Sequence, residues 1–455
     1  MSRNRTVYRC TECGHTEPKW AGRCPACGAW STLTEEVERP AAASGGRGGG
    51  GVPRELAMPI DQIDVLDWVP LPTGVAEVDH VLGGGLVPGS VTLIGGEPGI
   101  GKSTLLLQIL AKVAASHRRA LYVSAEESKQ QVRLRAERLG ALSPDLWLVS
   151  ETDLANVVAH IEEVKPEVVV IDSIQTIADA ELASAPGTVV QVRECANRLV
   201  QFAKSSGVAL VLVGHVTKEG ALAGPRVLEH VVDTVLSFEG DRHHALRVLR
   251  GIKHRFGPAG ELGVFEMLDA GLVAVPDPSS VFLADRARDI SGSVVVPTID
   301  GKRPLLVELQ ALTTPSPLQY PRRTAEGVDA GRLAFLLAVL QSRAGVATAH
   351  ADVYTLAVGG VQVREPAADL ALCLAVASSI SGTPLPPDLV AVGEVGLGGE
   401  VRRVGHLDRR LNEAVRLGMR RAIVPASSEG VPTGVRAIRV GSVLDALRTL
   451  GLFDR

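Results

Sequence analysis

A short glycine-rich stretch of this chain has the residue types and spacing to bind a polyphosphate. Residues 96–103 read GEPGIGKS, a full match to G-x-x-x-x-G-K-[ST], and the β-branched run at residues 91–94 precedes it as a predicted strand. Glycines let successive backbone N–H groups face one anion, and the N-terminus of the following helix adds partial positive charge. Lys102 is suited to reach the β- and γ-phosphates, and the Ser103 hydroxyl to bind Mg²⁺. The predicted nucleotide-binding residues are Gly96, Glu97, Pro98, Gly99, Ile100, Gly101, Lys102, Ser103 and Thr104.

Two acidic side chains downstream supply the remaining chemistry of nucleotide hydrolysis. Asp172 ends the buried strand pattern at residues 167–172, where a carboxylate that holds Mg²⁺ is expected. Glu126 follows the strand pattern at residues 120–124 and is predicted to orient and deprotonate the attacking water, with Glu127 as its competitor. Because open α/β sheets bind ligands at the carboxyl ends of their strands, these groups are expected at one sheet edge.

Two further groups of polar residues follow later strand patterns. His215 and Thr217 come after residues 208–214, and they either sense the γ-phosphate or cap the strand. The basic run KHRFG begins at Lys253 and includes Arg255. It is either a phosphate-binding patch, reaching a neighbouring subunit's nucleotide in an oligomeric ATPase, or a solvated charge run.

Four cysteines near the N-terminus have the spacing of a zinc site. They form two C-x-x-C pairs, and a glycine follows the second cysteine of each pair. Four thiolates at this spacing suit tetrahedral Zn²⁺, which would provide folding energy to a segment with almost no apolar core. Two disulfides or a redox pair are the rival interpretations. The predicted zinc ligands are Cys10, Cys13, Cys24 and Cys27.

Length and composition predict a multidomain globular protein. The 455 residues are 45% apolar but only 3% aromatic, so the cores are expected to consist of Ala, Val and Leu. A net charge of −4 argues against a uniformly basic nucleic-acid coat, but not against a local basic channel. Neither a signal peptide nor a membrane-spanning run is recognisable, and six cysteines fit a reducing cytoplasm.

Alternating strand and helix patterns predict an α/β fold with a parallel sheet covered on both faces. The expected domains are a zinc ribbon at 1–32, a flexible glycine-rich linker at 33–56, an ATPase domain at 57–275 and an α+β domain at 276–455. In the last domain, residues 293–300 and 304–311 are predicted to form a hairpin, and 351–358 and 389–395 to form strands. Helices are expected at 332–342, 368–379 and 407–417. Cys195 and Cys373 lie in apolar helical patterns and are predicted to be inert core residues.

The ATPase stretch resembles the RecA/KaiC class, of which TGVAEVDHVLGGGLVPGS at residues 73–90 is typical. Together with the four cysteines, the KHRFG run and the tail, it resembles the bacterial RadA (Sms) family of DNA-repair ATPases over nearly the whole chain. That family carries Lys-Asn-Arg-Phe-Gly, so His254 replaces the asparagine, whereas the cations Lys253 and Arg255 are retained.

The resemblance implies a hexameric ring that binds ATP between protomers, with Lys253 and Arg255 as catalytic residues offered to a neighbour. It further implies single-stranded and branched DNA and a RecA-type recombinase as partners. By this analogy, residues 173–187 and 218–226 contact DNA, and the activity is branch migration with helicase-like translocation.

The tail resembles the proteolytic domain of Lon but departs from its catalytic pair. Ala367 stands where the serine nucleophile is expected, and Asp408 stands in place of the lysine base, which predicts a non-proteolytic scaffold. Arg402, Arg403 and the pair Arg409–Arg410 form a basic stretch that either touches DNA or is an ordinary solvated face. An ATP-dependent protease and a KaiC-like regulatory protein remain the alternatives, and the phosphate loop does not discriminate ATP from GTP.

Overall fold

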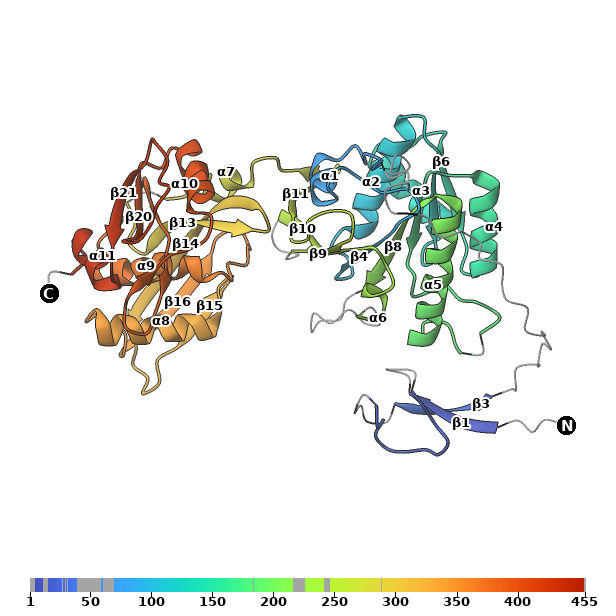
Figure 1. The fold of residues 1–455 in the computed structure, drawn as a ribbon, viewed down its shortest axis with the longest axis horizontal. Coiled ribbons are helices and arrows are strands. Elements are labelled where there is room, and N and C mark those ends of the chain that lie inside the picture. Colours follow the sequence, from blue (N-terminus) through green and yellow to red (C-terminus); the bar gives the residue numbers. More distant parts are fainter. Residues whose placement is uncertain are drawn as a thin grey trace. The chain divides into compact units, whose positions relative to one another are not determined.

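The computed structural model divides into two compact units, and each is described by itself (Figure 1). One comprises Met1–Glu239, Leu249–Ala259 and Met267–Leu272, and the other comprises Gly240–Val248, Gly260–Glu266 and Val273–Arg455. The continuous part of the second unit thus begins at residue 273, against the domain start predicted at 276. The described residues are 5–10, 15–26, 28, 30, 32–38, 59, 69–182, 184–215, 226–240, 246–287 and 289–453.

A nine-stranded sheet carries the phosphate loop, and it contains the strands predicted at 91–94, 120–124, 167–172 and 208–214. The spatial order is β12 (Gly271–Ala274), β11 (Leu262–Leu268), β10 (Leu246–His254), β9 (Thr234–Glu239), β4 (Val91–Gly96), β8 (Ala209–His215), β7 (Val168–Asp172), β5 (Ala120–Ser124) and β6 (Leu146–Ser150). Strands β9, β4, β8, β7, β5 and β6 are neighbours in this order and run parallel, as predicted.

Helices cover both faces of this sheet, as the alternating pattern predicts. Helices α4 (Leu154–Val164) and α5 (Val189–Ser206) pack on one face, where their apolar residues join those of β7 and β8 in one core. Helices α1 (Ala76–Val81), α2 (Lys102–Ala115) and α3 (Lys129–Arg138) cover the other. The short α6 (Arg226–Glu229) precedes β9.

Helix ends follow the capping chemistry in the sequence. Ser128 caps α3 through a capping box with Gln131, and Gly140 follows the helix at φ 61°. Asp153 and Thr188 cap α4 and α5 by accepting hydrogen bonds from backbone N–H groups. Cys195 is buried in α5, and burial raises its pKa to about 11, so its thiol is protonated at neutral pH, as expected of a core residue.

The second unit is built on a seven-stranded mixed sheet. The hairpin predicted at 293–311 is present, with Asp300 opposite Arg303 across its turn. The spatial order is β15 (Arg323–Glu326), β16 (Ala351–Ala357), β14 (Arg303–Pro315), β13 (Ser293–Asp300), β17 (Leu389–Ala391), β20 (Arg421–Pro425) and β21 (Arg436–Val440). Its helices are α7 (Pro278–Leu283), α8 (Ala330–Arg343), α9 (Asp369–Ser381), α10 (Leu407–Arg416) and α11 (Val443–Thr449). The predicted α8, α9 and α10 are confirmed within two residues at each end.

The strand predicted over residues 389–395 is wrong as a single element. The chain forms β17, leaves the sheet, and pairs again as β18 (Glu394–Val395) with β19 (Val401–Arg402). Between the two strands the Gly393 N–H donates to the Ala367 carbonyl, and a Cβ at Gly393 would lie 2.6 Å from a Val401 methyl carbon. The strand-like stretch at 389–395 therefore contains a break at Gly393 that tertiary contacts impose.

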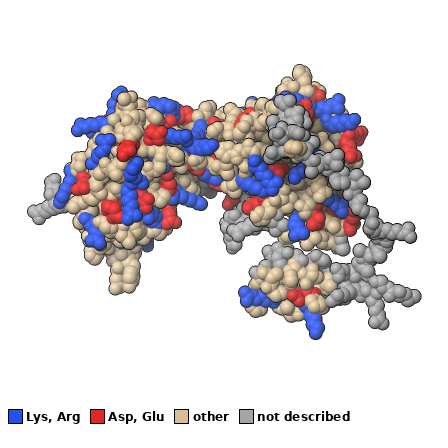
Figure 2. Space-filling view, viewed as in Figure 1, with Lys and Arg blue, Asp and Glu red and all other residues tan. Residues whose placement is uncertain are grey.

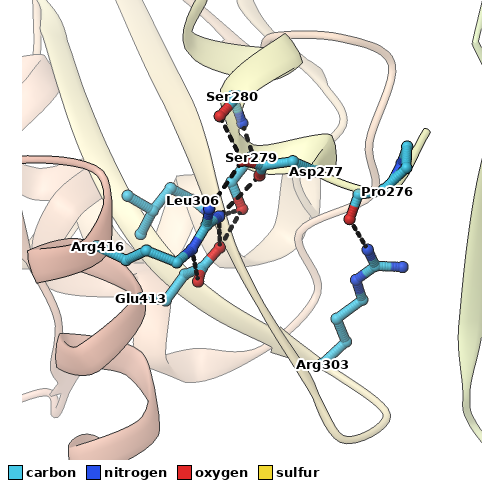
Figure 3. A network of polar contacts seen from close by, with 8 residues as sticks. All are labelled: Pro276, Asp277, Ser279, Ser280, Arg303, Leu306, Glu413 and Arg416. Atoms are coloured by element: carbon cyan, nitrogen blue, oxygen red, sulfur yellow. Dashed lines mark hydrogen bonds and ion pairs between the residues drawn. The ribbon is translucent and has the colours of Figure 1, made fainter.

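A polar network fixes the start of the second unit's continuous run to its own sheet and α10 (Figure 3). Arg416 pairs with both Asp277 and Glu413, and the Ser279 hydroxyl donates to Glu413 at 2.7 Å. The Arg303 guanidinium donates to the Pro276 carbonyl at 2.6 Å. The hydrogen bonds from Arg416 are the main reason that the pKa of Asp277 falls well below its usual range.

The N-terminal ribbon is a three-stranded antiparallel sheet of β2 (Thr16–Glu17), β1 (Arg5–Cys10) and β3 (Leu33–Glu38). Residues 33–38 therefore belong to the ribbon rather than to the linker predicted at 33–56, because they pair along the whole of β1. Within the described parts of the chain, no helix is both long and apolar enough to cross a lipid bilayer.

Candidate active site

The phosphate loop joins β4 to α2 and is closed by a glycine. Gly101 precedes α2 at φ 116°, a left-handed conformation that favours glycine, and a Cβ there would lie 2.7 Å from the Met267 methyl carbon. Lys102 then donates from Nζ to the carbonyls of Gly96, at 2.8 Å, and Glu97, at 3.0 Å. The ammonium is thereby folded back over the loop, where a phosphate would compete with these carbonyls for it.

Lys102 also lies in the electric field of both predicted carboxylates. Its side chain is buried, and burial lowers its pKa, while the negative charges of Asp172 and Glu126 oppose that shift. The structure thus brings together three residues that are far apart in the sequence, at the edge where β4, β5 and β7 end.

Asp172 is held by two hydroxyl groups. Its Oδ2 accepts a hydrogen bond from Ser103 Oγ at 2.6 Å and another from the Tyr122 hydroxyl at 2.5 Å. Sequence reasoning missed Tyr122. The sequence carries no signal for this contact, because it depends on the register that pairs Ser124 with Asp172 and places Tyr122 on the same sheet face as Ser124.

The two adjacent glutamates after β5 have different partners. The Ser173 hydroxyl donates to Glu126 Oε1, which places Glu126 beside the end of β7. Glu127 instead pairs with Arg135 on α3, at 2.6 Å. Because Arg135 already engages Glu127, the geometry favours Glu126 as the residue that would act on water.

His215 reaches the same edge in the backbone register. It is opposite Gly96, the first residue of the phosphate-loop motif. Thr217 and residues 218–225 lie outside the described residues.

Lys253 and Arg255 lie near the amino-terminal ends of β4 and β9, whereas the phosphate loop follows the carboxyl-terminal end of β4. The last residue of β10, His254, contacts Thr234, the first residue of β9, so β10 runs antiparallel to β9 and away from the phosphate loop. Arg255 pairs with buried Asp233, which also accepts the N–H of Val91 at the start of β4. Six residues of β4 therefore separate these cations from the loop of their own chain, about 17 Å at the usual rise of a strand.

The KHRFG run is integrated into the fold rather than exposed as a flexible charge run. Lys253 Nζ donates to the carbonyls of Glu229, at 2.6 Å, and Val232, at 2.8 Å, and burial together with the charge of Arg255 lowers its pKa. Lys253 and His254 are the last residues of β10, not a segment after a strand as predicted. Arg255 keeps about half of its side chain exposed.

His254 takes a structural position in place of the family asparagine. Its Nδ1 lies 2.9 Å from the Thr234 hydroxyl and its Nε2 lies 3.1 Å from the Leu82 carbonyl. The carbonyl can only accept, so Nε2 carries the proton and Nδ1 accepts from Thr234. Burial lowers the His254 pKa, so this neutral form persists at neutral pH.

The segment at 173–187 is anchored by a buried glutamine. Gln191 accepts from the Asp179 N–H and donates to the Asp179 and Ser184 carbonyls. The segment contains Asp179 and Glu181 but no Lys or Arg. A contact between this segment and DNA would therefore have to use backbone and neutral groups.

The small buried cluster of the ribbon contains two of the four predicted zinc ligands. Cys10 and Cys24 are buried with Leu33 in a small cluster. The N–H of Cys10 bonds to the His15 carbonyl, and the N–H of Gly28 bonds to the Cys24 carbonyl, which closes a turn at each cysteine pair. The side chain of His15 contacts Glu17, with 2.9 Å between His15 Nε2 and Glu17 Oε1. Cys13 and Cys27 lie outside the described residues, and no group of three or more possible metal ligands is found among the residues that are described.

The two positions of the predicted Lon-like pair differ in burial. Ala367 is buried in a cluster that includes Leu407, and the neighbouring Asp408 is an exposed acid in the first turn of α10. Beside them, Arg410 forms a two-pronged pair with Glu365, at 2.6 Å for each bond, and donates to the Pro297 carbonyl. No group at these two positions can attack a peptide bond.

The basic stretch predicted on this unit is only partly a surface. Arg410 is buried in the pair with Glu365, and Arg402 pairs with Glu400, which leaves the exposed Arg403 and Arg409 without a continuous row of cations. On the face shown in Figure 2, Lys and Arg alternate with Asp and Glu rather than gather in one patch.

Three segments of the chain match known protein families. Residues 8–35 match a family described as rubredoxin metal binding domain, residues 62–221 match an AAA domain, and residues 346–437 match the Lon protease (S16) C-terminal proteolytic domain. The fold is therefore an α/β P-loop ATPase with an N-terminal zinc ribbon domain and a Lon-like C-terminal domain.

Curated relatives match from end to end. A DNA repair protein RadA from Pseudomonas aeruginosa is 52% identical over 99% of this chain and all of its own length. Proteins of the same name from Halalkalibacterium halodurans and Bacillus subtilis are each 46% identical over 99% of this chain, and at least 99% of each relative is covered. At this identity and coverage, the chain belongs to the RadA family of DNA repair proteins.

Proposed function

We propose that this chain is a DNA-dependent ATPase of recombination and repair. It would process recombination intermediates by branch migration, with helicase-like translocation on single-stranded DNA. The observation that carries this proposal is the assembly of Lys102, Ser103, Asp172 and Glu126 at one sheet edge, in a member of a DNA repair family.

The donor set at this edge fits a magnesium nucleotide. A serine hydroxyl and an aspartate carboxylate are the oxygen groups that Mg²⁺ prefers beside phosphates, and bound Mg²⁺ would neutralise charge that develops on the phosphoryl oxygens. Lys102 would leave the carbonyls of Gly96 and Glu97 for the phosphates. Glu126 would accept the proton of the attacking water as the bond between the β- and γ-phosphates breaks and ADP leaves.

The positions of Lys253 and Arg255 support assembly into a ring of subunits. Lys253 and Arg255 lie too far along β4 to serve the phosphate loop of their own chain, so we propose that they act on the nucleotide of a neighbour in a homo-hexamer. Subunit mixing tests this assignment. Lys102→Ala and Arg255→Ala are each expected to be inactive, and mixed rings are expected to regain turnover, because some interfaces combine an intact loop with an intact arginine.

The coupling to DNA is tested by ATP turnover with and without single-stranded DNA at two salt concentrations. Stimulation that fades as salt rises is expected, because binding to the phosphate backbone releases counterions. Turnover that is indifferent to DNA would contradict the motor assignment for the chain alone. In that case a RecA-type recombinase would be added as the proposed loading partner.

We further propose that Cys10, Cys13, Cys24 and Cys27 hold Zn²⁺. The support is the burial of Cys10 and Cys24, which together with Leu33 form a small buried cluster in the ribbon. Native mass spectrometry is expected to show one zinc per chain, lost in Cys27→Ser. Retention of a full zinc equivalent in that variant would remove Cys27 from the site.

Proteolysis is not proposed for the Lon-like domain, because Ala367 and Asp408 replace the reactive pair. Incubation with casein and ATP is expected to release no peptides.

A further inference from the structure

Tyr122 is buried at the centre of β5 and points at the magnesium-site aspartate. Its side chain is only 2% exposed, and its hydroxyl donates to Asp172 Oδ2 at 2.5 Å. Ser103 donates to the same oxygen at 2.6 Å. Two donors on one carboxylate oxygen fix the rotation of the carboxyl group, which leaves Oδ1 as the oxygen available to face a metal-bound water.

The hydroxyl of Tyr122 lies in the protein interior and donates to Asp172 Oδ2. Ser103 differs, because its oxygen must also turn toward the metal when a nucleotide is bound. Of the two hydroxyl groups that donate to Asp172, only that of Ser103 is also expected to bind the metal, so Tyr122 acts on Asp172 alone.

We propose that Tyr122 is a positioning residue that holds the Asp172 carboxylate in the orientation required for Mg²⁺. This proposal rests on the proposed ATPase function, because it concerns the magnesium site of that reaction. Its test measures nucleotide binding and does not require ATP hydrolysis. Partners that orient metal-site ligands in this way typically contribute about 10- to 100-fold in metal affinity.

The role of the Tyr122 hydroxyl can be tested separately from the packing of its aromatic ring. Tyr122 lines a pocket of about 420 Å³ together with Leu107, Val132 and Leu148. Phenylalanine fills the same space, so Tyr122→Phe removes one oxygen and its proton without opening a cavity. Tyr354→Phe, on β16 of the second unit, is the matched control for loss of a hydroxyl.

The experiment is calorimetric titration of ADP into the full-length protein, with and without Mg²⁺, which requires neither hydrolysis nor DNA. In Tyr122→Phe, the factor by which Mg²⁺ tightens ADP binding is expected to fall about tenfold, with metal-free ADP affinity unchanged. Tyr354→Phe is expected to behave as the wild type. In an Asp172→Asn background, the tyrosine substitution should have no further effect, because its partner is already altered.

Two results would overturn the assignment. One is an equal loss of ADP affinity with and without Mg²⁺, which would indicate a purely structural tyrosine. The other is an unchanged magnesium factor in Tyr122→Phe. If the protein binds Mg-ADP in the expected manner but DNA leaves its turnover unchanged, the proposed function fails while the role of Tyr122 stands.

Discussion

The phosphate-loop edge and the Lon-like domain both contain hydrogen-bonded carboxylates, but the groups that bond to these carboxylates differ in charge. Asp172 and Glu126 accept hydrogen bonds from the neutral hydroxyls of Ser103, Tyr122 and Ser173. Glu365 and Asp369 are paired instead with the guanidinium groups of Arg410 and Arg332.

The difference decides what each region can do. A hydroxyl orients a carboxylate but leaves its charge in place, so a cation such as Mg²⁺ can still be attracted. A guanidinium neutralises the charge and occupies both oxygens, which leaves a stable but chemically closed site. A match to a catalytic fold therefore does not establish catalysis until the partners of its polar groups are known.

The largest expected effect comes from removing the only cation inside the phosphate loop. Lys102→Ala should reduce ATP turnover at least about hundredfold, because it deletes a preorganised charge at the phosphates. Lys129→Ala, an exposed lysine at the start of α3, is the control. Turnover within a few-fold of wild type in a folded Lys102→Ala protein would remove the loop from the mechanism.

Breaking the closed site should cost stability rather than catalysis. Arg410→Met leaves the half-buried Glu365 without its counter-charge, and the second unit should lose about 1–3 kcal/mol of unfolding free energy. Arg409→Met, its exposed neighbour, should have little effect. All four tryptophans precede residue 150, so an early transition seen by circular dichroism but not by tryptophan fluorescence would locate the loss in the second unit.

Acid should remove the same stabilisation. Burial acts to raise the pKa of Glu365, but the hydrogen bonds and charge of Arg410 outweigh it, and the pKa is lowered. The stabilisation is therefore complete above the unfolded pKa, about 4.3, and is lost as the pH falls through the lower folded pKa. The difference in melting temperature between wild type and Glu365→Gln should shrink below about pH 4; a difference that is constant from pH 7 to pH 3 would contradict the pairing.

The smallest effect is expected at the network that fixes Asp277 to α10. Arg416→Ala should destabilise the second unit by about 1 kcal/mol or less, because the Arg416 side chain is half exposed and solvent screens its pairs. Thermal unfolding followed by circular dichroism measures this shift. A loss as large as that of Arg410→Met would show that exposure does not distinguish the two networks.

Much of the first unit could be predicted from local sequence. The six parallel strands before residue 240 and the caps at Ser128, Asp153 and Thr188 follow from apolar runs and capping residues. The phosphate loop is recognisable because its glycines and lysine are contiguous. The break at Gly393 and the ribbon strand at residues 33–38 were not predictable, since each depends on a partner distant in sequence.

The sequence by itself determined the chemistry available: a phosphate loop, carboxylates at strand ends, four cysteines, and no nucleophile at Ala367. Only the tertiary structure decided how that chemistry is used. It gave Glu126 a hydroxyl partner and Glu127 an arginine, and it brought Tyr122 to Asp172. It also placed Lys253 and Arg255 at the sheet edge away from their own loop. The physical reason is that residue type sets charge and donors locally, whereas compensation of charge depends on groups that meet only when strands pair and helices pack.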